Sequence, residues 1–178
     1  MMSLLEIRAR VNDECREEIF IKGSTITTIE GDLSIRIGAK YLGQEPDSAE
    51  RPWLHDVFLD DFLMSMVQAA SALQGGKGPI EIELMGLIIK LRIYREGDSI
   101  CIAARIDAPM WQEVPRYEPM EPQCLGYKEF VDEVLGAARS AVKEVETTNP
   151  EARQSPLVRH LMNAVENLER NRVGLSGL

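Results

Sequence analysis

Few residues in this chain could do chemistry, and their spacing matches no catalytic motif. An imidazole beside carboxylates could hold a metal ion, and His55 is followed by Asp56, Asp60 and Asp61. On a helix, Asp56 and Asp60 would share one face, whereas His55 would project about 100° from Asp56. Acidic residues are also favoured at the start of a helix by its dipole. We therefore expect neither a metal nor a cofactor here.

Nucleophilic catalysis would need a serine or cysteine beside an imidazole. The other histidine, His160, falls on the polar side of a predicted helix. The cysteines, Cys15, Cys101 and Cys124, form an odd set without a C-x-x-C spacing. This set fits neither a disulfide framework nor a zinc site, so we expect reduced thiols. With no G-x-S-x-G or H-E-x-x-H motif, we favour a non-catalytic protein and leave an enzyme open.

A glycine cluster at residues 75–78 invites comparison with a phosphate-binding loop. A Walker-type loop runs from a strand to a helix, whereas this one runs from a predicted helix to a predicted strand. We interpret it as a helix stop followed by a connection.

Composition restricts the class of protein. The 178 residues are 44% hydrophobic and 28% charged, which is typical of a globular domain. The formal charge of −9 opposes nucleic-acid binding and leaves solubility or a basic protein partner as explanations. We see no apolar run long enough for a membrane span and no signal peptide at residues 1–6, so we expect a cytoplasmic protein that binds neither nucleic acid nor membrane.

Alternating apolar residues predict antiparallel strands in two groups. The first group covers residues 5–11, a short strand at 18–22, and a hairpin of 24–29 and 33–41 around Glu30-Gly31-Asp32. The second covers residues 80–84, 87–94 and 99–106, with the last two joined at Glu96-Gly97-Asp98.

Apolar residues at helical spacing predict helices over residues 52–74, 127–146 and 156–172, the last opened by Ser155-Pro156. Residues 108–126 carry four prolines without an apolar period and are predicted to be a loop. We expect a single α+β domain over residues 1–173, with two long helices on one face of antiparallel sheet, a C-terminal helix, and a frayed tail at 174–178.

An internal echo suggests a duplicated sheet-then-helix unit. Glu30-Gly31-Asp32 precedes Ser34-Ile35-Arg36-Ile37, and Glu96-Gly97-Asp98 precedes Ser99-Ile100-Cys101-Ile102. Half-repeats over residues 1–75 and 79–146 would be related by a pseudo-twofold axis. Chance similarity between ordinary strands is the alternative.

The polar side of the second strand group carries Lys90, Arg92, Tyr94 and Arg105. Glu81 and Glu83 should face the same side, so we expect cross-strand ion pairs rather than a basic recognition patch.

The two strand-to-helix loops are the predicted binding surface, because they hold both tryptophans of the chain. Aromatic residues and methionine are favoured at interfaces. The candidate partner-binding residues are Asp47, Glu50, Trp53, Met110, Trp111, Glu113, Tyr117, Glu118 and Glu121. The alternative is that the aromatic residues cover the end of the core.

Three functions follow from these features. The leading hypothesis is a module that binds a more basic protein, as a bacterial toxin-neutralising (immunity-type) or adaptor protein would. The first alternative is a small-molecule-binding or enzymatic domain with a pocket between the sheet and the first long helix. The second is a homo-oligomeric structural component, which includes a homodimer formed through the C-terminal helix.

Overall fold

The computed structural model describes residues 4–43, 50–84, 89–106 and 119–173. Its elements follow one another in this order: β1 (Leu5–Val11), α1 (Asp13–Lys22), η1 (Gly23–Thr25), β2 (Glu30–Ile37), β3 (Lys40–Tyr41), β4 (Leu54–Phe58), α2 (Leu59–Gln74), β5 (Ile80–Leu84), β6 (Ile89–Glu96), β7 (Ser99–Ile106), β8 (Met120–Gly126), α3 (Tyr127–Thr148), η2 (Pro150–Gln154) and α4 (Pro156–Val173).

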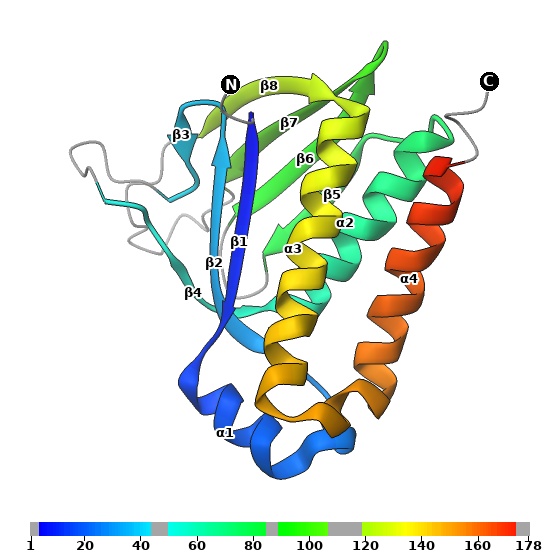
Figure 1. Cartoon of the computed structure of the whole chain (residues 1–178). Coiled ribbons are helices and arrows are strands. Elements are labelled where there is room, and N and C mark those ends of the chain that lie inside the picture. Colours follow the sequence, from blue (N-terminus) through cyan, green and yellow to red (C-terminus); the bar gives the residue numbers. More distant parts are fainter. Residues whose placement is uncertain (1–3, 44–49, 85–88, 107–118, 174–178) are drawn as a thin grey trace.

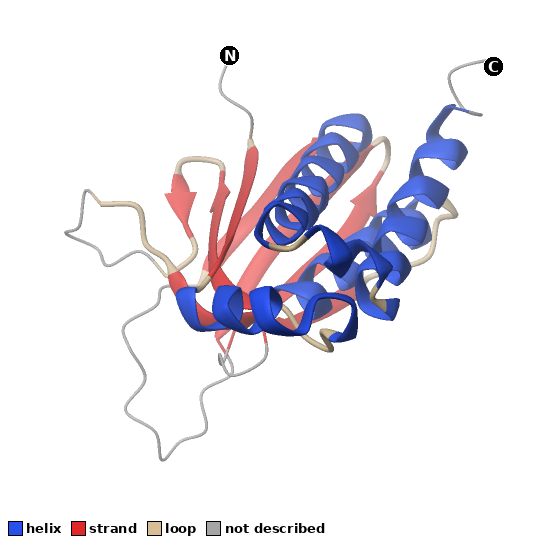
Figure 2. Ribbon diagram, turned by 60° about the horizontal axis from the view of Figure 1, so that its bottom comes forward, coloured by secondary structure: helices blue, strands red, loops and turns tan. Residues whose placement is uncertain are grey.

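The strands form two antiparallel sheets, which confirms the predicted α+β class. In the first sheet β2 is central and pairs with β1, β3 and β4. The second sheet is a meander in the order β5-β6-β7-β8. Helices α2, α3 and α4 lie together on one side of the sheets, and α1 lies at one end of the molecule (Figures 1 and 2).

One apolar cluster joins the sheets to the helices. Leu5, Ile7 and Val11 of β1 are buried with Leu33 and Ile35 of β2. The same cluster contains Ile93 and Ile102 from the second sheet, Phe62 from α2 and Phe130 from α3. Other large side chains in this cluster are Leu59, Leu63, Met66, Leu73, Leu84, Leu91, Val134, Leu161 and Leu168. Alternation along each strand and helical spacing along each helix therefore point the apolar residues into one core.

The strand predicted at residues 18–22 is wrong, because these residues belong to α1. The side chain of Asn12 caps the helix by accepting a hydrogen bond of 2.8 Å from the Cys15 amide. Asp13 and Glu14 in the first turn and Lys22 in the last complement the helix dipole. Local capping therefore outweighs the β-branched and aromatic content of this short segment.

The hairpin predicted around Glu30-Gly31-Asp32 is also wrong, because all three residues lie inside β2. A Cβ on Gly31 would lie 2.1 Å from the carbonyl oxygen of Arg10. This glycine therefore permits the close approach of β1 and does not form a turn. The turn comes later, at Gly38, whose φ of 63° leads from β2 into β3.

The first long helix begins at Leu59 and not at residue 52, because residues 54–58 form β4. The Leu59 amide donates to the carbonyl of Ile29 over 2.8 Å, and the Asp60 carboxylate accepts from the Ile29 amide over 2.9 Å. These bonds tie the strand-to-helix junction to the chain just before β2. The helical geometry predicted for Asp56 therefore does not apply.

Part of the loop predicted at residues 108–126 is strand β8. β8 lies at the edge of the second sheet, where proline is tolerated because its missing N–H faces away from the ladder. Pro122 falls at a register shift, opposite the interval between Ile102 and Ala104. The proline content that predicts a loop here therefore fits an irregular edge strand.

The remaining elements agree with the prediction to within a few residues. β5, β7, α3 and α4 begin where expected, and the turn at residues 97–98 joins β6 to β7. Ser155 caps α4 by accepting a hydrogen bond of 3.2 Å from the Val158 amide. Residues 87–88 and the tail at 174–178 lie outside the described residues.

The internal duplication stays a prediction. The second Glu-Gly-Asp segment lies at a hairpin, whereas the first lies within a strand. Each sheet is nevertheless followed by a long helix, α2 in one case and α3 in the other. Within the described ranges, no helix is long and apolar enough to cross a lipid bilayer.

Candidate functional site

Three of the nine predicted partner-binding residues lie in the described part of the chain. Trp53 is half-buried, and the Arg10 guanidinium lies 4.2 Å from the centroid of its ring. Glu50 is exposed, and Glu121 lines a cavity of about 190 Å³ together with Lys40. The other six lie outside the described residues: Asp47, Met110, Trp111, Glu113, Tyr117 and Glu118.

Charged residues cover the outer face of the first sheet, which is the face opposite the apolar core. Strand register places Glu6 of β1 opposite Arg36 of β2, and Arg10 opposite Asp32. The Arg10 Nε atom donates to Asp32 Oδ2 over 2.7 Å. Cross-strand pairing thus lines up opposite charges along two neighbouring strands.

Asp32 also holds His55, a pairing that is not predicted from the sequence. The Nδ1 atom of His55 lies 2.8 Å from Asp32 Oδ1. A register shift between Gly31 and Leu33 sets both His55 and Asp56 of β4 opposite Asp32. Asp56 has a φ of 55°, in the left-handed region that aspartate tolerates better than most residues. This bulge aims the imidazole of His55 at Asp32.

The Asp32–His55 pair corresponds to two of the three members of a nucleophilic triad. Ser34 lies on the same face of β2, and its buried hydroxyl has no hydrogen-bond partner among the described residues. Among the described residues, the imidazole is therefore oriented by a carboxylate and forms no hydrogen bond to a nucleophile. His160 is exposed on α4, as predicted. The absence of a catalytic site stays a prediction.

Glu6 lies at the centre of a second charged group on the same face. It accepts hydrogen bonds from Arg8 Nε at 2.6 Å, from Arg36 Nε at 3.2 Å and from Arg51 Nη2 at 3.3 Å. Burial by itself raises the pKa of Glu6. Hydrogen bonds from Arg36 and Arg8 and the charge of Arg51 have a larger, opposite effect, so the pKa lies below the ordinary 4.5. Glu6 is therefore an ionised anchor for three guanidinium groups.

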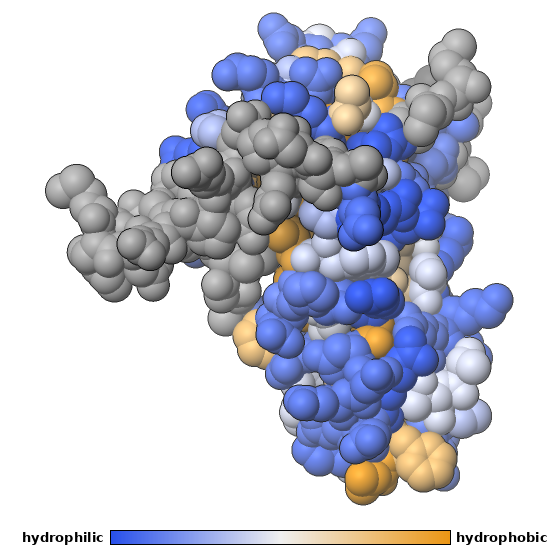
Figure 3. Space-filling model, turned by 90° about the vertical axis from the view of Figure 1, so that its left-hand side faces the viewer, coloured by the Kyte–Doolittle hydropathy of each residue, from blue (hydrophilic) through white to orange (hydrophobic). Residues whose placement is uncertain are grey.

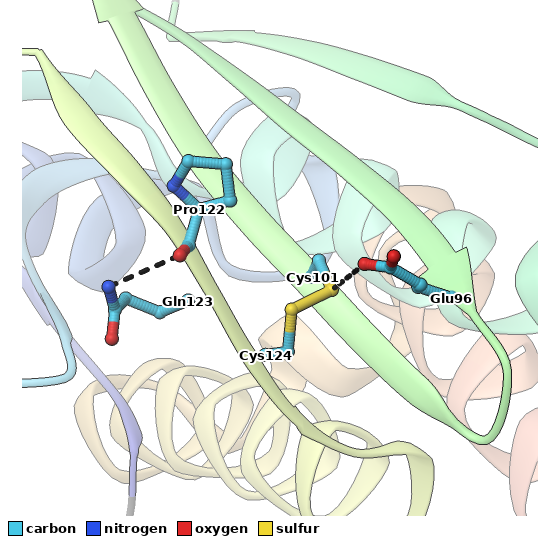
Figure 4. Close-up of a disulfide and its surroundings, with 5 residues drawn as sticks. All are labelled: Glu96, Cys101, Pro122, Gln123 and Cys124. Carbon is cyan, nitrogen blue, oxygen red and sulfur yellow. Dashed lines mark hydrogen bonds between the residues drawn. A yellow bond between two sulfur atoms is a disulfide. The ribbon is translucent and has the colours of Figure 1, made fainter.

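The prediction of reduced thiols is wrong for two of the cysteines. Cys101 of β7 and Cys124 of β8 form a disulfide, and they are directly opposed in the register (Figure 4). The pairing depends on β8 being a strand, which was not predicted. Cys15 remains a free thiol, and burial raises its pKa, so it is a poor nucleophile at neutral pH.

Glu96 lies beside this disulfide, 3.5 Å from Cys101 Sγ (Figure 4). Glu96, Cys101 and Cys124 form the one group in the described ranges with ligand atoms close enough to share a metal ion. In the disulfide neither sulfur is a thiolate, which is the form that binds metals. This cluster is therefore a structural cross-link in the oxidised chain.

The polar face of the second sheet is paired as predicted. Lys90 Nζ lies 2.7 Å from Glu83, and Arg105 Nη1 lies 3.7 Å from Glu81. The Arg92 guanidinium lies 5.8 Å from the Tyr94 ring centroid. These contacts are consistent with an ordinary solvated sheet face.

The most exposed large apolar side chains of the described residues lie on α1. Phe20 is 72% exposed and Ile21 is 80% exposed. Figure 3 shows an apolar patch at the end of the molecule where α1 lies, bordered by hydrophilic surface. Sequence analysis missed these residues because it placed them in a strand, although Asn12-Asp13-Glu14 is a recognisable helix start.

Exposed acidic residues precede these two side chains on α1, Glu17 by one turn and Asp13 and Glu14 by about two. Asp13, Glu14 and Glu17 are exposed, and none of them forms an ion pair within the described ranges. On a helical wheel, Glu17 falls between Phe20 and Ile21. We call Asp13, Glu14, Glu17, Phe20 and Ile21 the α1 surface.

The rest of the chain holds α1 firmly in place. The Asn149 side chain donates to the carbonyls of Ile19 and Phe20 over 3.2 and 3.1 Å, which satisfies two acceptors at the helix end. Arg16 pairs with Glu144 of α3 and donates to the Val11 carbonyl. Cys15 and Ile19 of α1 itself are buried against the rest of the chain. The α1 surface is therefore presented on a fixed support.

Comparisons with protein-family models, with curated proteins and with solved structures find no match to this chain. The function must therefore be argued from the surfaces themselves.

Proposed function

We propose that this chain is a non-catalytic protein-interaction module, and that its α1 surface docks on a more basic protein with an apolar recess. Toxin-neutralising and adaptor proteins are examples of this kind of module. The observation that carries the proposal is the exposure of Phe20 and Ile21 on the same helix as exposed carboxylates that form no ion pair within the described residues.

The chemistry of the α1 surface favours a protein partner. A large aromatic side chain entering a pocket is typical of a binding hot spot, and surrounding charges add specificity and speed of association. The exposed carboxylates of α1 and the net charge of −9 favour a basic partner. Because Asn149, Arg16 and the buried side chains already order the helix, docking would cost little conformational entropy.

The predicted loop residues form a second part of this proposal. Trp53 is held against Arg10, and Trp111 lies outside the described residues. We retain both loops as a separate candidate contact surface, with Trp111 and Tyr117 as its anchors. An experiment should therefore compare the two surfaces.

The two alternatives have less support. The first alternative places a ligand pocket between the sheet and α2, but Leu59, Phe62 and Met66 of this helix are buried in the apolar cluster there. The apolar stripe of α4, which includes Leu161 and Val165, is buried within the same chain. A homodimer through α4 would therefore have to use its polar side.

The test is affinity capture from the source cell with matched variants as bait. Wild type is compared with Phe20→Ala/Ile21→Ala, with Trp111→Ala, and with Leu4→Ala as an exposed apolar control. A specific partner is retained by wild type and by Leu4→Ala and is lost with the α1 double variant. Truncating a hot-spot residue costs about 2 kcal/mol or more, which is about 30-fold in Kd.

Charge reversal gives an independent readout of the same contact. Glu14→Lys/Glu17→Lys should release the partner, whereas Glu166→Lys, an exposed site on α4, should not. Retention of every captured protein by both α1 variants would refute the α1 surface, and loss only with Trp111→Ala would move the site to the loop. Light scattering on the purified chain separates a foreign partner from self-association.

The predicted cytoplasmic location is also part of the proposal. The Cys101–Cys124 disulfide weighs against it, because disulfides are rare in reducing compartments. Rapid alkylation of thiols in intact cells, followed by mass spectrometry of these two residues, decides the point. Alkylation of Cys101 and Cys124 would mean that both thiols are reduced in the cell, which is the result expected for a cytoplasmic protein.

A further inference from the structure

A cavity of about 500 Å³ opens where the outer face of the first sheet meets α3. Its charged wall consists of Glu6, Arg8, Arg36, Arg51 and Glu133, and Tyr41 provides an aromatic wall. The cavity is distinct from the α1 surface and shares no residue with it.

The described residues that line the cavity include more arginines than carboxylates, although the protein as a whole is acidic. Three guanidinium groups face two carboxylates in its wall, and the whole chain carries a formal charge of −9. One carboxylate, Glu6, already joins all three arginines. The other, Glu133, accepts a hydrogen bond of 2.7 Å from the Ile7 amide. Among the described residues that line the cavity, three guanidinium groups therefore share two carboxylates.

The three arginines differ in how many donors they have left. Arg36 is nearly buried, and its Nη1 donates to the Gly38 carbonyl over 2.7 Å, so it forms the base of the site. Within the described ranges, Arg8 donates hydrogen bonds only from Nε, and Arg51 donates them only from Nη2. A guanidinium has five N–H donors in a planar fork, so Arg8 and Arg51 each keep several donors for an outside acceptor.

Tyr41 contacts Arg51 in the wall of the cavity. The Arg51 Nη2 atom donates to the Tyr41 hydroxyl over 3.1 Å, and its guanidinium carbon lies 5.4 Å from the ring centroid. The two carboxylate oxygens of Glu6 accept from the same Nη2 atom at 3.3 and 3.4 Å. The fork is therefore positioned before any ligand arrives, which lowers the entropy lost on binding.

We propose that this cavity binds the oxyanion of a small molecule, a carboxylate or a phosphate group, through Arg8 and Arg51, with Arg36 as the buried base. Planar guanidinium forks suit both oxyanions because they can donate two parallel hydrogen bonds. Glu6 shows that a carboxylate fits among these three side chains, and an incoming oxyanion would occupy the donors that Glu6 leaves unused. This inference does not depend on the proposed function.

The test is a titration of the full chain with inorganic phosphate and, separately, with succinate, at low ionic strength. Binding is followed by amide NMR and calorimetry for wild type, Arg8→Ala, Arg51→Ala and Arg105→Ala. Arg105 is an exposed arginine paired with Glu81 on the second sheet, so its variant changes the net charge equally without touching the cavity. Comparing the two probes shows which oxyanion is preferred.

We expect saturable binding to wild type and to Arg105→Ala, with shifts of β1 and β3 amides. Arg8→Ala and Arg51→Ala should each weaken binding at least about tenfold, which corresponds to about 1.4 kcal/mol. Arg8 is the exposed member, with 57% of its side chain accessible, so its variant should fold even if Arg51→Ala does not. The proposal is overturned if neither probe saturates by about 10 mM, a concentration above any useful affinity. Equal weakening in Arg105→Ala overturns it as well, since that result means general charge attraction.

Discussion

The Glu133 carboxylate on α3 accepts a hydrogen bond of 2.7 Å from the backbone N–H of Ile7 on β1. Glu129 and Glu144 accept from the Leu4 and Val11 amides in the same way, at 2.9 and 3.2 Å. β1 is an edge strand of the first sheet, so the Ile7 and Val11 amides point away from β2, and Leu4 directly precedes this strand. Three carboxylates of one helix thus satisfy an edge that could otherwise pair with another chain.

The first prediction concerns this covered edge. Glu133→Ala leaves the Ile7 amide without its partner and should lower the free energy of unfolding by about 1–3 kcal/mol. Asp132→Ala, at the exposed neighbouring position, removes a surface ion pair with Lys128 and should change it by less than about 1 kcal/mol. Urea denaturation of the two variants measures the difference, and an equal loss in both would contradict a specific role for Glu133.

The second prediction concerns the pH dependence of stability. The pKa of Glu6 is lowered in the folded chain, so its contribution is present above the unfolded value of 4.5 and is lost as the pH falls through the folded pKa. Burial raises the pKa of Glu133, so protonation of this carboxyl favours the folded chain. This protonation-linked contribution is present below 4.5 and is lost as the pH rises through the folded pKa, whereas the hydrogen bond from Ile7 is a separate contribution.

The variants Glu6→Gln and Glu133→Gln should therefore behave oppositely in chemical denaturation at a series of pH values. Glu6→Gln should be less stable than wild type at pH values above 4.5, with the two curves converging on acidification. Glu133→Gln should be at least as stable as wild type at neutral pH, because an amide oxygen can still accept from Ile7. If both variants were less stable than wild type at neutral pH, or both at least as stable, the two carboxylates would not differ as described.

The third prediction compares two glycines. Gly31→Ala would place a Cβ 2.1 Å from the Arg10 carbonyl oxygen and 2.6 Å from Leu59 Cδ1, so it should destabilise by about 3 kcal/mol, the upper end for overpacking. Gly136→Ala on α3 meets nothing within 4 Å and should stabilise by about 0.5–1 kcal/mol through helix propensity. Thermal melting of both variants measures these opposite changes in stability. If Gly31→Ala were as stable as wild type, β1 and β2 would not be this close.

The fourth prediction concerns the disulfide. Cys101 and Cys124 are 23 residues apart, and closing a loop of this length stabilises a folded chain by about 3 kcal/mol in the chain-entropy model. Cys101→Ser/Cys124→Ser should lose about this amount in urea denaturation under non-reducing conditions. With a thiol reductant present, wild type should fall to nearly the stability of the variant. A reductant that leaves wild type unchanged would contradict the cross-link.

Sequence alone determined the elements whose signals are local. The i, i+3, i+4 pattern predicted α3, the Ser155-Pro156 cap predicted the start of α4, and alternation predicted β1, β5 and β7. It also predicted the ion pairs of the second sheet, because alternation places Glu83 and Lys90 on the same face of neighbouring strands. In each case, the residues that decide the structure are close together in the chain.

Tertiary structure decided the features whose partners are far apart in the sequence. Gly31 resembles a turn residue until β1 is seen packed against it, and β8 carries a proline that only an edge strand accommodates. Glu6 joins Arg36 and Arg51, which are 30 and 45 residues away, and His55 reaches Asp32 only through a bulge. Residue spacing does not specify strand register or which strands become neighbours, because both depend on packing of the whole core. The arginine cavity and the cross-strand disulfide therefore became visible only in the folded chain.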